Sequence, residues 1–192
     1  MANFAAMRLL EADGRLTGGV RLLLGAVSGV PDGLLKAVRV LPKELNWLRF
    51  PWYAAARGGG AFVMGDRIFA HRRFFEPGAY RAFLFLLAHE VGHLPHAARF
   101  GASSTAKARF VCWAAGHYLR SALAHGRNAH RLARIEQEAE RGRWILAELT
   151  RLTPAEPPFN LLSDEHAMQA WLKRHEHTIA ELHRRYPGWP LP

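Results

Sequence analysis

Apolar residues recur at helical spacing at the start of the chain. Residues 3–12 and 15–29 carry them three or four positions apart, which predicts two amphipathic helices. Pro31 then begins another short helix, because proline is favoured in a first helical turn, and this helix is expected to continue to Leu41. The segment is expected to be structural.

A hairpin pattern follows a run of three glycines. Residues 61–64 and 67–70 are mostly apolar and flank Gly65-Asp66. Two such runs separated by two turn-forming residues are typical of a tight β-hairpin. We therefore expect two short antiparallel strands here.

The most apolar helix of the chain is predicted over residues 79–93. It contains the run Phe83-Leu84-Phe85-Leu86-Leu87, and Gly92 is its only helix-breaking residue. A helix that is apolar on nearly all sides is a buried one. This helix is expected to lie in the core.

Three more helices are expected after it. Ser103 can cap a helix that runs to about His125, and a turn then leads into a helix over residues 129–152. These two helices are expected to pack as an antiparallel pair. Asp164 lies in the first turn of a last helix that runs to about Tyr186.

These elements predict an α+β fold that is predominantly helical, with a small antiparallel hairpin packed on the helix of residues 79–93. The length of 192 residues favours a single domain. Within it we expect a helical N-terminal extension (1–45), a catalytic core (46–152) and a helical C-terminal tail (153–192). No apolar run approaches the roughly 20 residues of a membrane crossing, so no membrane insertion is expected.

The chain is strongly basic, with 26 Lys and Arg against 16 Asp and Glu and a formal charge of +10. Such a surplus attracts polyanions, but the basic residues do not alternate with aromatic ones as in a strand-binding platform. Nucleic acid is therefore not the expected partner.

Cys112 is the only cysteine, and the first residues do not resemble a secretory signal. We expect a cytoplasmic location or delivery by a route that needs no signal peptide.

The candidate chemistry lies at the end of the apolar helix, in His89-Glu90-Val91-Gly92-His93. A spacing of four places both imidazoles on one helix face, where they can share one zinc ion. Glu90 is then beside the metal, as a general base for a zinc-bound water whose pKa falls to about 7. Chance matches to this pattern occur on ordinary helices, but burying three polar groups in an apolar helix without a metal or a partner would cost several kcal/mol.

A catalytic zinc site needs a third protein ligand. His96 is close in sequence, but Pro95 disturbs the helix between it and His93. The better candidate is Glu136, at the margin of an apolar helix face, with Glu140 one turn later to orient a ligand histidine. The other histidines that could serve as ligands are His117, His125 and His130.

At these residues the chain resembles the minigluzincins, a group of small zinc metallopeptidases whose second motif reads Glu-x-x-Ala-Asp. Glu136-Gln137-Glu138-Ala139 matches that motif, with Glu140 in place of the aspartate. The resemblance covers roughly residues 58–150. It implies Glu136 as third ligand and Glu140 as support for a ligand histidine, while the departure at Glu140 keeps Glu138 as a substitute ligand.

The resemblance also implies how a substrate would bind. An edge strand beside the active-site helix receives the substrate as an added strand, and residues 61–64 or 67–70 could do so. The candidates for stabilising the oxyanion are His117, Tyr118 and His130.

The sequence therefore predicts a hydrolase: a zinc-dependent endopeptidase that cleaves protein or peptide substrates. A regulatory protease, a housekeeping peptidase and a toxin effector are three settings for it, and an inhibitor or immunity protein would be a further partner of the last. The alternative is a non-catalytic protein that zinc stabilises and that binds nucleic acid through its basic surface. Glu90 favours the enzyme, because a structural zinc site has no use for a base.

Overall fold

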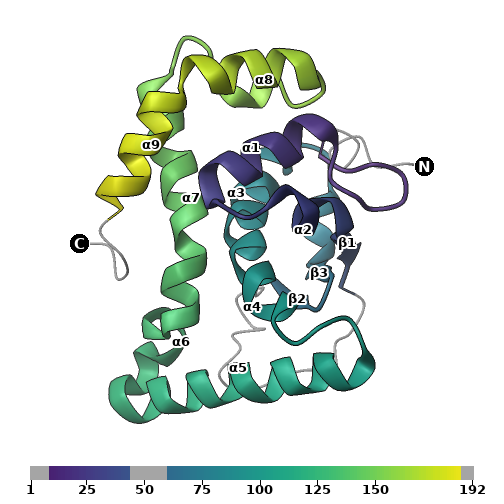
Figure 1. The fold of residues 1–192 in the computed structure, drawn as a ribbon, viewed down its shortest axis with the longest axis vertical. Coiled ribbons are helices and arrows are strands. Elements are labelled where there is room, and N and C mark those ends of the chain that lie inside the picture. The colour runs from purple at the N-terminus through teal and green to yellow at the C-terminus, as the bar shows by residue number, and fades with distance from the viewer. Residues whose placement is uncertain (1–8, 44–59, 187–192) are drawn as a thin grey trace.

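The computed structural model describes residues 9–43 and 60–186, and it has the predominantly helical α+β fold that the sequence predicts (Figure 1). A small sheet lies beside the helices, and α7 runs most of the length of the molecule. The helices are α1 (Gly18–Ser28), α2 (Asp32–Ala37), α3 (Tyr80–Glu90), α4 (Leu94–Ala98), α5 (Ser104–His125), α6 (Ala129–Leu132), α7 (Arg134–Leu152), α8 (Glu165–Arg174) and α9 (Glu176–Arg185). Short 3-10 turns are η3 (Arg72–Phe75), η4 (Val91–His93), η5 (Gly126–Asn128) and η6 (Pro158–Asn160).

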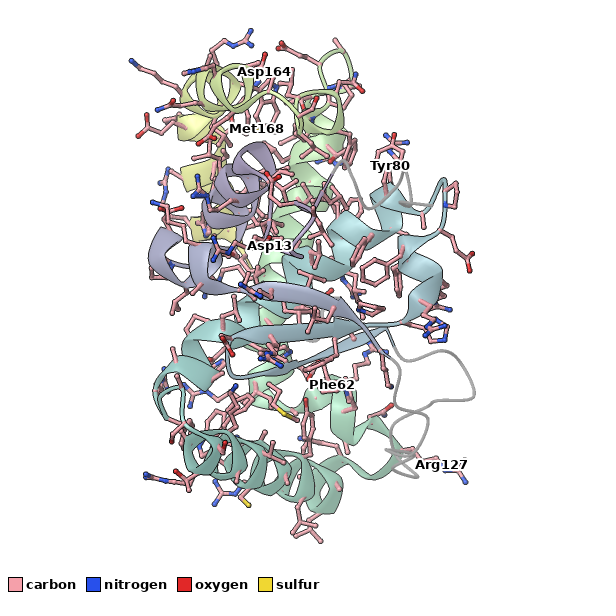
Figure 2. All side chains as sticks on the ribbon, turned by 90° about the vertical axis from the view of Figure 1, so that its right-hand side faces the viewer. Asp13, Phe62, Tyr80, Arg127, Asp164 and Met168 are labelled. Atoms are coloured by element: carbon pink, nitrogen blue, oxygen red, sulfur yellow. The ribbon has the colours of Figure 1, made fainter. Side chains whose placement is uncertain are left out.

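The sheet contains the predicted hairpin and one further strand. Strands β2 (Ala61–Met64) and β3 (Arg67–Ala70) pair antiparallel, which confirms the hairpin. The third strand, β1 (Arg39–Pro42), pairs parallel with β3, so the order is β1-β3-β2 and the sheet is mixed. Phe62 of β2 lies between the sheet and α5 (Figure 2).

The prediction of a helix up to Leu41 is wrong, because α2 ends at Ala37. Val40 is buried and Arg39 is exposed, which is the alternation of a strand with one covered face. The backbone of β1 also has partners that a helix would not give it: the Val40 amide donates to the Gly14 carbonyl at 2.8 Å. Tertiary pairing with β3 therefore overrides the helical spacing.

The first predicted helix lies mostly outside the described residues. Its last part, residues 9–12, is not helical, since Leu10 forms an isolated antiparallel bridge with Leu16. The helix predicted over residues 15–29 begins at Gly18 instead and ends in a left-handed glycine, Gly29.

The core helix is present as expected. Phe83, Leu84, Leu87 and Ala88 of α3 are fully buried. The α-helical hydrogen bonding stops at Glu90, and the chain continues through the 3-10 turn η4 into α4. Both histidines of the motif thus lie on one nearly continuous helical segment.

The predicted antiparallel pair of helices is not formed. Ser103 caps α5 as expected, by accepting a hydrogen bond from the Ala106 amide. The next helix, however, is broken at Ala133, whose extended backbone (φ −65, ψ 132) separates α6 from α7. Ala133 is buried at this corner, and α5 runs across the N-terminal end of α7 instead of lying along it (Figure 1).

The two ends of the described chain pack on the central helices. α1 contacts α3, α7 and α8, and its Leu23 and Leu24 are fully buried. Asp164 caps α8 by accepting a hydrogen bond from the Ala167 amide, and a break at His175 divides the predicted last helix into α8 and α9. None of the described helices is both long enough and apolar enough to cross a membrane. The division into extension, core and tail stays a prediction.

Two glycines let α7 approach the motif helix at backbone distance. A Cβ atom added at Gly92 would lie 2.6 Å from the Cα atom of Ala139. One added at Gly142 would overlap the carbonyl oxygen of Ala88. Small residues at this crossing therefore determine how close the side chains of α7 come to His89.

We expect Gly142→Ala to lower the free energy of unfolding by about 1–3 kcal/mol, because the added methyl group meets backbone that cannot move aside. Urea unfolding of the metal-free protein measures this. Gly116→Ala is the matched control: nothing lies within 4 Å of its Cβ position, and it should gain about 0.5–1 kcal/mol. Equal effects of the two variants would contradict the close-contact explanation.

Candidate metal centre

Three side chains from two segments meet at the crossing of the motif helix with α7. His89 lies in the last turn of α3, His93 ends η4, and Glu136 lies in the first turn of α7. One ligand atom from each of the three lies within 4.8 Å of the others. The structure thus brings together the predicted metal ligands.

The spacing of these atoms suits a small ion. The Nε2 atom of His89 lies 3.2 Å from Glu136 Oε2, and Nε2 of His93 lies 3.7 Å from Glu136 Oε1. Donors bound tetrahedrally at about 2.0–2.1 Å from zinc are about 3.3 Å apart. Two imidazoles and one carboxylate also form the protein part of a known class of catalytic zinc site.

Glu140 holds His89 from behind. Its Oε2 lies 3.0 Å from Nδ1 of His89, and its Oε1 accepts a hydrogen bond from Arg143 Nε at 2.7 Å. A carboxylate on Nδ1 fixes the ring orientation and directs Nε2 to the metal position. Glu140 therefore lies where the prediction of a supporting residue requires it.

Burial lowers the pKa of His89, but hydrogen bonds to Glu136 and Glu140 outweigh it and raise that pKa to about 10. Burial alone would raise the pKa of Glu136, yet His89 and the nearby imidazoles lower it to about 2. Without a metal, His89 is therefore an imidazolium between two carboxylates. A metal ion would take the place of its Nε2 proton.

The second imidazole behaves differently. Burial lowers the pKa of His93 to about 4, so that its ring is neutral at neutral pH. A neutral imidazole is the form that binds metal ions. His93 is thus ready to act as a ligand without losing a proton.

Glu90 is a buried carboxyl group at the end of α3, with 5% of its surface exposed. Burial raises its pKa to about 7, against the opposing effect of His89. The pKa of a general base is best near the operating pH, since the group must both take and return a proton. Glu90 has that property.

The three candidates for stabilising the oxyanion lie in different places. Tyr118 donates a hydrogen bond to Glu136 Oε1, and His130 Nε2 lies 3.7 Å from the same oxygen. His117 instead packs its ring against Trp113, with centroids 4.4 Å apart. Of the three oxyanion candidates, Tyr118 and His130 are at the centre.

Glu138 points elsewhere on α7. Its Oε2 lies 3.1 Å from Nε2 of His96, its Oε1 accepts from Arg134, and the side chain is 41% exposed. Among the described residues, the ligand group contains Glu136 and not Glu138.

The sheet corrects one prediction about substrate binding. Residues 67–70 cannot receive an added strand, because β3 is paired on both sides. β2 is an edge of the sheet within the described residues, and only residues 61–64 keep that role.

Sequence reasoning also missed Arg143, for which the only signal is its position three residues after Glu140.

No protein-family model, curated protein or solved structure matches the chain. The function is therefore inferred from the residues of this centre.

We expect Glu140→Gln to weaken zinc binding about 10- to 100-fold, because an amide on Nδ1 supports the ligand ring less strongly than a carboxylate. Competition with a chromogenic zinc chelator measures the affinity. Glu148→Gln, on the same helix and paired only with Arg151 among the described residues, should bind zinc as the parent does. Unchanged affinity in Glu140→Gln would show that Glu140 does not support His89.

Proposed function

We propose that the protein is a zinc-dependent endopeptidase. The observation that carries the proposal is the convergence of His89, His93 and Glu136 on one point, with Glu90 next to the first ligand. Bound zinc supplies a Lewis acid that lowers the pKa of water and polarises a carbonyl group. Two imidazoles and one carboxylate are the protein ligands of one class of catalytic zinc site, in which the fourth position is left for water or substrate.

The chain's own groups supply the proton transfers. The carboxylate of Glu90 takes a proton from the attacking water and later donates it to the amine of the leaving peptide. Its burial supports this role, because a carboxylate shielded from water is a stronger base.

The two candidates for the oxyanion have different roles. The hydroxyl proton of Tyr118 is engaged by Glu136, so this residue orients a ligand. His130 is half-exposed, stacks on the Tyr118 ring and reaches the centre from α6, with its Nε2 atom 3.7 Å from Glu136 Oε1, so its ring lies where it could turn toward a substrate oxygen. We assign the oxyanion contact to His130 and the substrate-strand contact to β2.

Digestion of an unfolded protein such as reduced casein tests the activity. New amino termini, identified by mass spectrometry, should appear with the zinc-loaded protein, vanish with a chelator and return with added zinc. Bound zinc together with nucleic-acid binding and no cleavage would support the non-catalytic alternative instead.

Zinc binding should release at least one proton near pH 8, because His89, with a pKa of about 10, must lose its Nε2 proton, and ionisation of a bound water adds to the count. Glu90 is mostly ionised at that pH and adds little. The apparent affinity should then rise about tenfold per pH unit until the pH reaches the His89 pKa. Titration calorimetry in buffers of different ionisation enthalpy counts the protons, and a count of zero would contradict the imidazolium at His89.

A further inference from the structure

Helix α5 carries an uncovered apolar stripe. Leu119 is 64% exposed, Leu123 is 83% exposed and Val111 is 44% exposed. Among the described residues, the only other exposed large apolar side chain is Leu152. Leu119 and Leu123 are four residues apart and lie on one face of the helix, and Val111, two turns before Leu119, lies at the edge of that face. Except for Arg120, the exposed residues between them are small: Cys112, Ala115, Gly116 and Ala122.

The stripe is not part of the protein core. The opposite face of α5 makes the internal contacts, through the buried residues Ala106, Phe110 and Ser121. In both views α5 lies along one end of the molecule, and no other described element covers its outer side (Figures 1 and 2). Exposed leucines at this spacing indicate a surface that another body covers.

The surroundings of the stripe are cationic. Residues 91–135 contain no Asp or Glu. Arg109 and Arg120 are exposed, and they are eleven residues apart, which is about three helical turns. Both therefore lie along the same border of the stripe, and Arg127 follows at the end of α5 (Figure 2). Lys107 and Arg134, in contrast, are neutralised by Asp66 and Glu138.

We propose that α5 is a docking surface for an anionic lipid membrane. Leu119 and Leu123 would enter the boundary between headgroups and acyl chains, while Arg109 and Arg120 contact lipid phosphates. Charge complementarity selects this occupant over a second copy of the chain, since two such cationic faces repel each other. The exposed leucines favour a membrane over nucleic acid, because nucleic acid has phosphates but little apolar surface for aliphatic side chains to contact.

Docking would also position the metal centre. Tyr118, beside Leu119 on α5, contacts Glu136, so the centre lies on the inner side of the docked helix. The diameter of a helix is about 10 Å, which sets the approximate height of the centre above the membrane surface. The docking surface itself needs neither a bound metal nor hydrolytic activity.

Co-sedimentation with vesicles tests the proposal on the full chain. We expect binding to equimolar phosphatidylglycerol and phosphatidylcholine, and at least about tenfold weaker binding to phosphatidylcholine alone. Leu119→Ser combined with Leu123→Ser should weaken binding at least about tenfold, whereas Leu152→Ser should not. Arg109→Gln with Arg120→Gln should weaken it more than Lys173→Gln with Arg185→Gln, which removes two exposed charges from α8 and α9.

Cys112 offers a second readout, because it is the only cysteine and is exposed on the stripe. A nitroxide attached there should become more accessible to oxygen, which concentrates in lipid, when anionic vesicles are added. The proposal is overturned if anionic vesicles are not bound, or if the leucine variant binds them as the parent does. It is equally overturned if those leucines instead hold a dimer together in ultracentrifugation, or retain an acidic protein while vesicles are ignored.

Discussion

Glu90→Gln should retain one zinc ion per chain and lose about a hundredfold to ten-thousandfold of the peptide hydrolysis rate. The amide has the size of the carboxyl group but cannot take a proton from water. Because none of the three ligand side chains changes, the metal should stay bound. The rate on a fluorogenic peptide derived from a mapped cleavage site gives the loss, and elemental analysis gives the zinc content.

The same substitution separates a catalytic role from a structural one. Burial raises the pKa of Glu90 to about 7, above its unfolded value of about 4.5. Ionising Glu90 therefore lowers the free energy of unfolding as the pH rises above about 4.5, and the full cost is reached above about pH 7. The metal-free variant should therefore be at least as stable as the parent near pH 8. A variant with zinc, normal stability and the parent's rate would falsify the assignment of Glu90 as the base.

Glu136→Ala should weaken zinc binding by more than about a hundredfold, since it removes a ligand and not only a supporting group. The protein should contain no zinc after exhaustive dialysis, and hydrolysis should be lost with it. Glu138→Ala is a matched control two residues away, and it should keep one zinc because its carboxylate faces His96 and Arg134. The reverse result would make Glu138 the ligand.

Truncation at Glu136 also leaves the Tyr118 hydroxyl without its acceptor. Glu136→Gln keeps an oxygen for Tyr118 and removes only the charge. If this second variant also loses zinc while its circular dichroism equals the parent's, the loss results from the missing ligand charge and not from disturbed folding.

Local spacing in the sequence predicts the hairpin, the core helix and the grouping of the candidate ligands. His89, Glu90 and His93 are fixed relative to one another by helical spacing alone, which is a local property. Glu136 could be chosen because the apolar face of its helix, which includes Ile135 and Ala139, is visible in the sequence, and both residues are buried. The hairpin likewise depends on its own short turn.

Features that depend on distant contacts were not predictable in this way. Strand β1 exists because Val40 pairs with Ile68, far along the chain. The corner at Ala133 and the crossing of α5 over α7 depend on which faces become buried together. Arg143 supports Glu140, but an arginine three residues after a glutamate is common on exposed helices.

The close approach of α7 to the motif helix has a consequence for ion discrimination. Gly92 against Ala139, and Gly142 against Ala88, bring backbone into contact with backbone, which cannot repack as side chains can. The spacing of the two helices that carry the ligands is therefore set by the main chain and cannot widen easily. Calcium requires more oxygen ligands, at about 2.3–2.6 Å, so we expect this centre to discriminate against calcium both by its nitrogen donors and by its narrow frame.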